Sequence, residues 1–370
     1  MKALILAAGK GERLRPLTDT VPKVMLPVAG KPLLQHNLEQ LSGVVEEAVI
    51  VIGYKGAAIK DYFGSEFQGI KLRYVEQKEQ LGTGHALMQA KGALKGRFVM
   101  MMGDDLYRKE DIAKCAKNEL AVLCLRGDTR NFGACIEEGG MLKRIVEKSE
   151  KPVSPLVNTG LYVLDERVFA VKLRKSPRGE YEATDAINAI AAKGGVRCVQ
   201  GSFWMPVGYP WKLLEANEAL LKESGSFIHP QARVSEKAQI EGPVYIGKGA
   251  TLRNCVVRGY SSIGEGAVIG NFVEIKNSII MNDTKIPHLS YVGDSVIGPD
   301  CNFGAGTKVA NLRFDDKNVM VKVKGKLVDS GRRKLGCIMG AGSKTGINAS
   351  ILPGAVIPAG GTVGPGEVFS

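Results

Sequence analysis

The sequence has few aromatic residues, 6% of its 370 positions, and only four histidines. It has no run of 18 apolar residues, which excludes a helical membrane span. The apolar stretch near Met1 is too short for a secretory signal, so we expect a cytoplasmic protein that does not act at a membrane. Its seven cysteines are scattered and form no CxxC pair, which predicts buried thiols in a reducing compartment rather than disulfides or a metal site.

The net charge of +12 is consistent with either nucleic acid or phosphorylated metabolites as ligands. No zinc-finger spacing, homeodomain helix or aromatic RNA-binding motif accompanies that charge, so we do not expect a nucleic-acid partner. A charged fraction of 24% and an apolar fraction of 44% exclude a disordered chain. The length suits two domains, for which we expect the boundaries 1–225 and 226–370.

Glycine is the residue in excess, with 46 in the chain against a usual share of about 7%. Residues 1–225 contain 24 of them, and the shorter stretch 226–370 contains the other 22. The second stretch lacks the composition of a linker and the strict period of collagen. Its architecture must therefore require glycine at intervals.

In residues 1–225, short apolar runs rich in β-branched residues alternate with helical patterns. The predicted strands are Ala3–Ala7, Ala48–Ile52, Ile70–Val75, Phe98–Met102, Leu120–Leu125, Val157–Val163 and Val196–Gln200. The predicted helices are Pro32–Leu41, Gly84–Leu94, Tyr181–Lys193 and Leu213–Leu221. This alternation predicts a mostly parallel sheet with helices on both faces, and ligands bind such sheets beyond the carboxyl ends of the strands.

Two loops that follow predicted strands carry residues suited to phosphate chemistry. After the first strand, Gly9 and Gly11 would let backbone N–H groups approach an anion, while Arg13 and Lys23 add positive charge. After Phe98–Met102 comes Asp104, a carboxylate that could hold Mg²⁺. Taken alone, the first loop could merely start a helix and the aspartate could merely cap a turn.

Taken together, these loops resemble the sugar-1-phosphate nucleotidylyltransferases. The matching residues are Leu6-Ala7-Ala8-Gly9-x-Gly11-x-Arg13-Leu14, Pro22-Lys23, Gln77, Leu81-Gly82-Thr83-Gly84, Gly103-Asp104, Gly133, Glu147-Lys148 and Asn158-Thr159-Gly160. The resemblance implies an α/β nucleotidyltransferase domain with a Rossmann-like sheet, which transfers a nucleotide from a nucleoside triphosphate to a sugar-1-phosphate. No covalent intermediate is needed, because the attacking phosphate oxygen is already ionised.

The same resemblance implies a role for each matching residue. Leu6, Ala7, Ala8, Gly9, Gln77, Gly82 and Thr83 would bind the nucleotide, Lys23 and Arg13 would stabilise charge on its phosphates, and Asp104 would hold Mg²⁺. Gly133, Glu147, Lys148 and Asn158 would bind the sugar phosphate.

One departure from the family concerns the second metal ligand. The family has Asp or Asn in a pattern like Trp-x-Asp-x-Gly, and here Pro206 stands at that position between Trp204 and Gly208. Either Asp104 holds the metal with phosphates and water, or Asp105 or Asp185 substitutes, or this half has lost much of its activity. We expect a reduced or altered metal dependence.

Residues 226–370 carry aliphatic side chains at intervals of six. The series runs through Ile228, Val234, Ile240, Ile246 and Leu252, then Val257, Ile263, Ile269 and Ile275, then Ile286 and Val292, then Ile297, Phe303 and Val309, and finally Ile351, Ile357 and Val363. A period of six fits neither a helix nor a simple strand, but it is typical of the hexapeptide repeat of a parallel β-helix. The array resembles the left-handed β-helix of hexapeptide acyltransferases, which implies a homotrimer.

An insertion interrupts the six-residue register between Val309 and about Met339. Residues 322–334 contain six basic residues against a single Asp329. Alternating lysines suit a solvated edge hairpin, but loops that project from a solenoid commonly carry binding sites. We therefore favour contact with phosphates, such as those of coenzyme A.

The repeat array also resembles the acetyltransferase half of the bifunctional glucosamine-1-phosphate acetyltransferase/N-acetylglucosamine-1-phosphate uridyltransferases, in their archaeal form. The resemblance rests on Arg258, Gly270 to Lys276, His288 to Tyr291, Asn302, Gly304 to Thr307 and Asn311. It implies that His288 takes the proton from the attacking amine, for which an imidazole is suited near neutral pH. Arg258, Lys276, Tyr291 and Asn302 would bind the amino-sugar phosphate, and Ala305, Asn311, Arg332, Arg333 and Lys334 would face acetyl-CoA. Leu312 replaces a tyrosine of the bacterial enzymes.

These observations favour a bifunctional enzyme that acetylates glucosamine-1-phosphate and couples a sugar-1-phosphate to UTP or dTTP. One alternative is a nucleotidylyltransferase whose β-helix is only a trimerisation or regulatory scaffold. Another is an acetyltransferase whose N-terminal half has lost its activity through Pro206.

Overall fold

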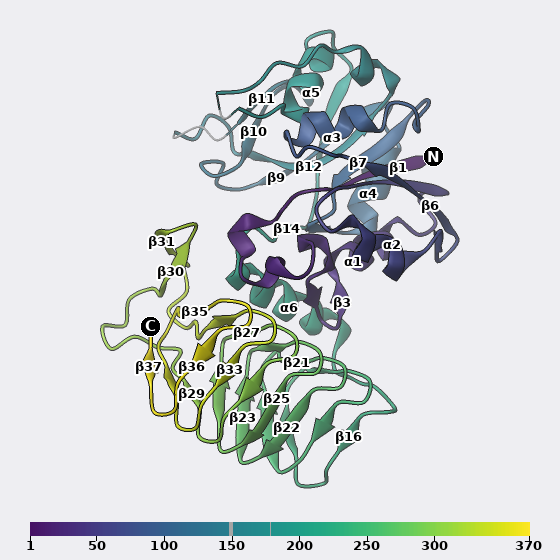
Figure 1. Cartoon of the computed structure of the whole chain (residues 1–370). Helices are drawn as coiled ribbons and strands as arrows, with labels where there is room; N and C mark the ends of the chain where they lie inside the picture. The colour runs from purple at the N-terminus through teal and green to yellow at the C-terminus, as the bar shows by residue number, and fades with distance from the viewer. Residues whose placement is uncertain (148–150, 178) are drawn as a thin grey trace. The chain divides into compact units, whose positions relative to one another are not determined.

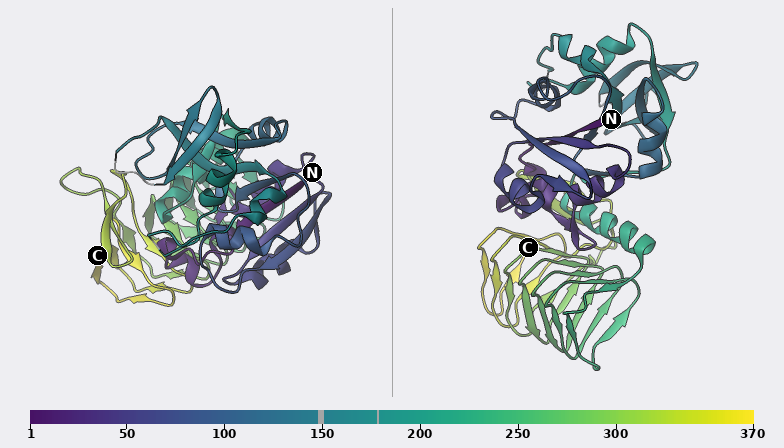
Figure 2. Two further views of the ribbon diagram at one scale, coloured as in Figure 1. Left: turned by 90° about the horizontal axis from the view of Figure 1, so that it is seen from above. Right: turned by 90° about the vertical axis from the view of Figure 1, so that its right-hand side faces the viewer.

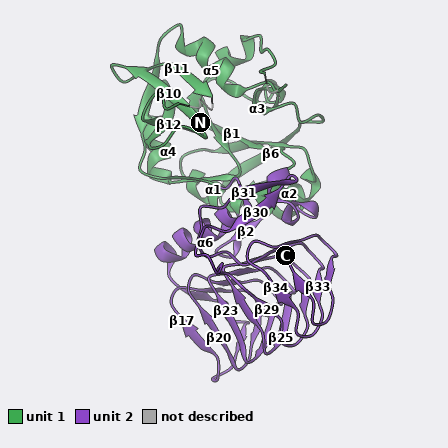
Figure 3. Cartoon of the chain, turned by 90° about the vertical axis from the view of Figure 1, so that its left-hand side faces the viewer, with its two compact units in different colours: residues 1–10, 22–25, 33–206 green, residues 11–21, 26–32, 207–370 purple. Residues whose placement is uncertain are grey.

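The computed structural model describes residues 1–147, 151–177 and 179–370. These residues form two compact units (Figure 3). Unit 1 consists of residues 1–10, 22–25 and 33–206, and unit 2 consists of residues 11–21, 26–32 and 207–370. The domain boundaries expected from the sequence stay a prediction, because compact units follow contacts and do not define separate functions.

Unit 1 is built on one ten-stranded sheet (Figure 1). In spatial order its strands are β10 (Gly133–Glu138), β11 (Met141–Glu147), β13 (Val196–Gln200), β9 (Leu120–Arg126), β12 (Leu156–Leu164), β7 (Phe98–Met102), β1 (Lys2–Ala7), β4 (Glu47–Ile52), β6 (Ile70–Glu76) and β5 (Glu66–Phe67). All seven strands expected from the sequence are present. The hairpin of β10 and β11 and the short edge strand β5 are additional.

The direction of the strands changes along the sheet. Strands β7, β1, β4 and β6 are parallel neighbours, whereas β12 runs antiparallel to both β7 and β9. The carboxyl ends of β1 and β7 therefore lie at one edge of the sheet. The loops that carry Gly9 and Asp104 follow these two strands, at the edge where the sequence predicts a ligand site.

Successive residues of β1 enter two different cores. Leu4 and Leu6 pack into one apolar cluster, whereas Ala3, Ile5 and Ala7 pack into the other. This division is expected of a strand buried on both faces. The first cluster includes side chains of α3 (Thr83–Gln89) and α5 (Ala183–Ala191), and the second includes side chains of α1 (Leu33–Leu41), α2 (Gly56–Phe63) and α4 (Lys109–Ala116). The predicted α/β fold with helices on both faces is confirmed.

Unit 2 contains three parallel sheets of seven short strands each (Figure 2). The first face consists of β15 (Phe227–Ile228), β18 (Tyr245–Ile246), β21 (Ser262–Ile263), β24 (Ile279–Ile280), β27 (Val296–Ile297), β32 (Ile338–Met339) and β35 (Val356–Ile357). The second face consists of β16 (Arg233–Val234), β19 (Thr251–Leu252), β22 (Val268–Asn271), β25 (Lys285–His288), β28 (Asn302–Phe303), β33 (Lys344–Thr345) and β36 (Thr362–Val363). The third face consists of β17 (Gln239–Glu241), β20 (Cys255–Arg258), β23 (Val273–Lys276), β26 (Tyr291–Gly293), β29 (Lys308–Val309), β34 (Ser350–Ile351) and β37 (Val368–Phe369).

The predicted left-handed parallel β-helix is confirmed, and the structure explains its irregular register. Ile263 pairs with Ile280, so that coil contains 280 − 263 = 17 residues rather than three times six. The terminal coils contain 18, as in the pair Ile228 and Ile246 (246 − 228). One corner of each 17-residue coil is therefore shorter by one residue. That shortening produces the slip that the sequence shows at Val257.

The insertion leaves the β-helix after β29 and folds as a hairpin. Its strands are β30 (Met320–Val323) and β31 (Lys326–Asp329), joined by the turn Lys324-Gly325. Val319 and Val321 are buried, whereas Lys324 is exposed and forms a 2.6 Å ion pair with Glu12, another residue of unit 2. The edge hairpin that the alternating lysines suggested is therefore present. Its contact with phosphates stays a prediction.

Two pairs of short strands and one long helix are also present. The strands β2 (Pro27–Val28) and β3 (Lys31–Pro32) form a hairpin, β8 (Asp105–Tyr107) pairs with β14 (Trp204–Pro206), and α6 (Pro210–Ser224) is the longest helix described. Within the described ranges, none of the helices combines the length and apolar content needed to cross a membrane.

The corners of the β-helix predict a strong effect of adding one methyl group. A Cβ at Gly270 would overlap the carbonyl group of Pro287 on the next coil. We expect Gly270→Ala to lower the free energy of unfolding by about 3 kcal/mol, in the range of overpacked cores. At Gly92 a Cβ would meet no atom within 4 Å, so Gly92→Ala is the control and should cost far less. Urea denaturation of both variants measures the difference, and equal stability would contradict this account of the corner.

Candidate active sites

The backbone after β1 is open where the sequence predicts phosphate binding. Leu6, Ala7 and Ala8 are buried, and the Ala8 carbonyl oxygen accepts a 3.2 Å hydrogen bond from the Tyr54 N–H group. The next residue, Gly9, is exposed, and a Cβ there would meet nothing within 4 Å. A ligand can therefore approach the backbone closely at this point.

Lys23 and Asp104 form an ion pair beside this loop. Lys23 begins a short 3₁₀ helix (Lys23–Met25), and its side chain is only 11% exposed. Its Nζ contacts Oδ2 of Asp104, which follows β7. Although they are 81 positions apart in the sequence, the fold brings together the cation predicted to act on the phosphates and the carboxylate predicted to hold the metal.

A buried asparagine fixes the turn that carries Asp104. Asn37, on α1, is completely buried, and its Nδ2 donates to the carbonyl oxygens of Asp105 at 2.7 Å and Gly103 at 3.2 Å. A longer contact of 3.5 Å reaches the Met102 carbonyl oxygen. Among the described residues, nothing bonds to Asn37 Oδ1. Such an unpaired oxygen is costly, so the amide is retained for its N–H donors. The role of Asn37 could not be recognised in the sequence, because the residue lies within an apolar helical pattern.

Asp105 lies opposite Pro206, the position of the missing metal ligand. These two residues pair across β8 and β14, and Asp105 Oδ2 accepts a 3.0 Å hydrogen bond from the indole N–H of Trp204. Asp185 lies in the first turn of α5, where partial burial and the Glu182 carboxylate raise its pKa. Of the two proposed substitutes, Asp105 is the one that lies directly opposite Pro206.

The residues at this turn fit a magnesium site with few protein ligands. Mg²⁺ is commonly bound by one or two carboxylates together with substrate phosphates and water. Asp104 and Asp105 supply such carboxylates at the edge of the sheet. Over the described part of the chain there is no group of three or more His, Cys, Asp or Glu side chains arranged to hold a metal, so substrate oxygens would have to complete the coordination.

The predicted base-binding loop is held by its own hydrogen bonds. The buried Gln77 donates from Nε2 to the Gly82 carbonyl oxygen at 3.1 Å. Gly82 has a φ of 107°, and a Cβ there would lie 2.5 Å from the Tyr181 carbonyl oxygen. Thr83 Oγ1 accepts a 3.0 Å hydrogen bond from the Ala183 N–H group at the start of α5. These hydrogen bonds fix the shape of the loop, and one of them uses the Thr83 hydroxyl oxygen as its acceptor.

Three of the four predicted sugar-phosphate residues come together. Gly133 and Glu147 pair across the hairpin of β10 and β11, and Asn158 belongs to β12. A Cβ at Gly133 would lie 3.2 Å from both Glu147 Oε1 and Asn158 Nδ2. Asn158 Nδ2 also donates to the Tyr162 hydroxyl at 2.7 Å. The fourth residue, Lys148, lies outside the described residues.

Arg13 belongs to unit 2 rather than to unit 1. Its guanidinium lies over the ring of Tyr209, 5.1 Å from the centroid. Tyr209 stacks in turn on Trp211, with centroids 4.7 Å apart and an interplanar angle of 7°. Arg13 is thus oriented by an aromatic stack at the start of α6, which the sequence did not indicate.

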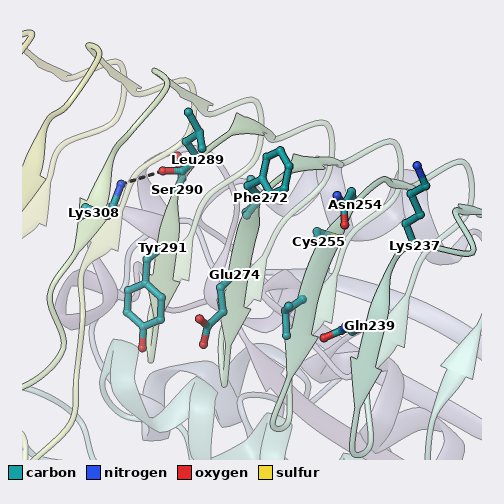
Figure 4. A pocket seen from close by; sticks show the side chains of 12 residues that line it. Lys237, Gln239, Asn254, Cys255, Phe272, Glu274, Leu289, Ser290, Tyr291 and Lys308 are labelled. Atoms are coloured by element: carbon teal, nitrogen blue, oxygen red, sulfur yellow. Dashed lines mark hydrogen bonds between the residues drawn. The ribbon is translucent and has the colours of Figure 1, made fainter.

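The third face of the β-helix contains a hollow of about 400 Å³. Glu274 and Tyr291 project from its floor, while Phe272 and Leu289 stand at one end of the strands (Figure 4). Arg258 and Lys276 pair on adjacent strands at the other end. Arg258 Nε donates to Glu274 Oε1 at 2.8 Å. Three predicted amino-sugar-phosphate residues, Arg258, Lys276 and Tyr291, are thereby grouped on one face.

Three other predicted residues of the acetyl site, His288, Asn302 and Ala305, lie on or beside the second face. His288 ends β25 with an exposed side chain, and its carbonyl oxygen accepts a 2.7 Å hydrogen bond from Ser290 Oγ. Asn302 begins β28 and is exposed, and Ala305 lies in the corner that follows. Within one chain, His288 and the Arg258–Lys276 pair therefore occupy different corners of the coil.

The basic residues of the insertion differ in their exposure. Arg333 is 64% exposed and forms an ion pair with Asp316 at 2.7 Å. The backbone of Lys334 forms an isolated antiparallel β-bridge with that of Leu312. Arg332, in contrast, is only 18% exposed and faces Asp294. Asn311 Nδ2 donates to Asp294 Oδ2 at 2.6 Å. Of the predicted acetyl-CoA residues, Arg332 and Asn311 thus both contact Asp294. Each predicted role stays a prediction.

Comparison with known families places both parts of the chain. A family model described as nucleotidyl transferase matches residues 2–223, and a model described as the GMPPB C-terminal domain matches residues 250–358. A crystal structure of UDP-glucose pyrophosphorylase complexed with UDP-glucose is 25% identical, with a TM-score of 0.55 over 60% of this chain and 98% of that one. The chain belongs to the nucleotidyl transferase family.

Curated relatives that match nearly the whole chain narrow this assignment. The bifunctional protein GlmU of Methanocaldococcus jannaschii is 41% identical over 96% of this chain and 92% of its own length. A bifunctional sugar-1-phosphate nucleotidylyltransferase/acetyltransferase of Sulfurisphaera tokodaii is 40% identical over 100% of this chain and 97% of its own. Within its class, the chain is a member of this bifunctional nucleotidylyltransferase/acetyltransferase family, as its two sequence resemblances indicated.

The asparagine at the Asp104 turn generates a prediction. Asn37→Leu keeps the volume but removes the donor from buried carbonyl oxygens, so we expect it to lower the free energy of unfolding by about 2 kcal/mol. Asn37→Asp should cost more, because a carboxylate oxygen would face those carbonyl oxygens. Asn118 also donates to carbonyl oxygens, at the accessible end of α4, and Asn118→Ala is the control. Urea unfolding that shows Asn37→Leu to be as stable as the wild type would contradict the role of the amide.

Proposed function

We propose that this protein catalyses two consecutive steps in the synthesis of a nucleotide sugar, UDP-N-acetylglucosamine. Its β-helix transfers an acetyl group from acetyl-CoA to glucosamine-1-phosphate, and its α/β domain then couples N-acetylglucosamine-1-phosphate to UTP, with dTTP as the other candidate. The observation that carries the proposal is that two groups of predicted residues lie together, Lys23 with Asp104, and Arg258 with Lys276 and Tyr291 on the third face of the β-helix. The names of the bifunctional relatives support it.

In nucleotidyl transfer, an oxygen of the sugar-1-phosphate attacks the α-phosphorus of the nucleotide and forms a new P–O bond. The bond between the α-phosphorus and the bridging oxygen of the β-phosphate breaks, and pyrophosphate leaves with that oxygen. Lys23 supplies a nearly buried positive charge, where charge stabilisation is stronger than in water. Mg²⁺ bound by Asp104 and the phosphates would supply further charge neutralisation when present.

In acetyl transfer, the amine nitrogen of glucosamine-1-phosphate attacks the thioester carbonyl carbon. His288 would accept the proton from that nitrogen, the C–N bond forms, and the C–S bond breaks to release coenzyme A. The exposed position of the His288 side chain leaves it accessible to substrates. Arg258 and Lys276 provide adjacent positive charges for the sugar phosphate.

The assembly and location follow the same family. We propose a homotrimer, since His288 and the Arg258–Lys276 pair lie at different corners of one chain and a neighbouring copy could bring them together. A cytoplasmic location suits a protein that consumes nucleotides and acetyl-CoA.

The buried cysteines Cys115, Cys255 and Cys337 have pKa values raised to about 12, about 11 and about 12, chiefly by burial. Such raised pKa values suit a structural rather than a reactive role.

The proline at the second ligand position generates a prediction about metal dependence. Pro206→Asp places a second carboxylate across from Asp105, so we expect the Mg²⁺ concentration for half-maximal pyrophosphate release to fall by about tenfold, equivalent to about 1.4 kcal/mol. Pro206→Ala relaxes the backbone without adding charge and serves as the control. An unchanged Mg²⁺ requirement in Pro206→Asp would count against a metal site weakened by proline.

His288 distinguishes an acetyltransferase from a scaffold. We expect His288→Ala to lower the release of coenzyme A in the presence of glucosamine-1-phosphate by about a hundredfold or more, as for loss of a general base. Pyrophosphate release by the same variant should remain within about twofold of wild type, because the residue is outside unit 1. If the wild-type protein released no coenzyme A, the β-helix would be a scaffold instead.

A further inference from the structure

One corner of the β-helix carries a ladder of amide and carboxylate side chains. Asn277, Asp294 and Asn311 occupy the end of the third face on three successive coils, each 17 residues after the last (294 − 277 and 311 − 294). Asn277 Nδ2 donates to Asp294 Oδ1 at 2.7 Å, and Asn311 Nδ2 donates to Asp294 Oδ2 at 2.6 Å. Both carboxylate oxygens of Asp294 are therefore used, one by each neighbouring coil.

The backbone conformation at this corner favours glycine, asparagine or aspartate, but it does not explain a buried charge. Asp294 has a φ of 48°, and glycine adopts this left-handed region most readily. On the coil before Asn277, this corner is occupied by Gly259, which has a φ of 65°. A Cβ at Gly259 would lie close to Asn277. Asp294 is only 4% exposed, and a buried carboxylate is costly unless it is paired. Its side chain must therefore be retained for the contacts that it makes.

On one side, those contacts lead to the hollow of the third face. The Asn311 amide that donates to Asp294 also lies 3.3 Å from the Tyr291 hydroxyl. A Cβ at Gly293 would lie 2.5 Å from that hydroxyl and 2.7 Å from Asn311 Nδ2, so glycine leaves room for the pair to meet. Asp294 thus fixes the Asn311 amide, and the amide fixes the phenol of Tyr291.

On the other side, Asp294 holds the returning end of the insertion. Arg332 Nη2 lies 3.7 Å from Asp294 Oδ1, and its Nη1 lies 4.0 Å from Glu215 on α6. The Asp294 carbonyl oxygen accepts a 2.9 Å hydrogen bond from the Gly336 N–H group. The adjacent Leu335 N–H group donates to the Asn311 carbonyl oxygen at 2.9 Å. The insertion is therefore anchored at the ladder by Arg332 and by its backbone.

We propose that Asp294 is a positioning residue of the acetyl-transfer site, which sets the orientation of Asn311 and Tyr291 and anchors the insertion beside them. The proposal rests on the acetyl-transfer function proposed above. Asp294 itself touches no reacting group. It acts through the amide of Asn311 and through Arg332, which the sequence resemblance had assigned to acetyl-CoA.

The test replaces Asp294 with an amide of the same size. In Asp294→Asn, the side chain loses its charge and one of its two acceptor oxygens, so it no longer forms an ion pair with Arg332 and cannot accept hydrogen bonds from both flanking amides in the native arrangement. We expect the KM for glucosamine-1-phosphate to rise by about tenfold or more, with a smaller change in kcat, because ground-state positioning is lost. Pyrophosphate release from UTP by the same sample, together with its thermal unfolding midpoint, reports whether the chain is folded.

Asn277→Ala is the matched control, since it removes a hydrogen bond to the same carboxylate on the side away from Asn311. It should lower the unfolding midpoint about as much as Asp294→Asn does while leaving the KM within about twofold. A rise in KM equal to that of Asp294→Asn would overturn the proposal, because any loosening of the corner would then suffice. So would an unchanged KM in Asp294→Asn.

A second measurement separates this proposal from the proposed function. Hydrogen exchange of the Leu335 and Gly336 amides should accelerate by about tenfold in Asp294→Asn and not in Asn277→Ala, whether or not the protein acetylates its substrate. If the wild type released no coenzyme A, the acetyl-transfer function would fail, and unchanged exchange at these amides would separately overturn the anchoring role of Asp294.

Discussion

The β-helix depends on one constraint, that each coil outside the insertion must close after 17 or 18 residues so that equivalent side chains stack on one another. In the interior this produces continuous columns of aliphatic residues, such as Ile263, Ile280 and Ile297, each at most 1% exposed. The same closure stacks outward side chains, because residues one coil apart are neighbours in a parallel sheet. Arg258 and Lys276 are adjacent for that reason. The predicted amino-sugar-phosphate residues Arg258, Lys276 and Tyr291 are thus brought together by the stacking of successive coils.

That constraint also decides what the sequence could predict. The six-residue interval is visible because each repeat needs a small or left-handed residue at its corner and an aliphatic side chain inside. The resemblance supplied Arg258, Lys276 and Tyr291, which the third face brings together. It assigned no role to Glu274, which lies within the matching residues, or to Asp294, because a carboxylate at an outward position resembles any solvated residue in a sequence. Only the pairing of coils shows that Glu274 contacts Arg258 and that Asp294 is buried between two amides.

In unit 1, the residues that could be predicted are those that end strands. Asp104 and Gly9 follow β7 and β1, and the rule that ligands bind beyond the carboxyl ends of parallel strands locates both. Gly133, Glu147 and Asn158 were recognised one by one, but their proximity depends on the antiparallel hairpin of β10 and β11, which the strand pattern did not contain. Asn37 could not be predicted, because a buried amide within an apolar helix is explained only by the carbonyl oxygens that it meets.

The phosphate-binding signature itself is divided between the two compact units. Gly9 and Lys23 belong to unit 1, whereas residues 11–21, including Arg13, and residues 26–32 belong to unit 2. Within unit 2, the Ala29 N–H group donates to Asn217 on α6 at 2.7 Å, and a Cβ at Gly340 would lie 2.9 Å from Pro16. Arg13 is held by Tyr209, while Lys23 is held by Asp104. Two residues predicted to act on the same phosphates are therefore held by contacts within different compact units. The unit that contains the β-helix thus also includes and supports part of the segment predicted to bind the nucleotide.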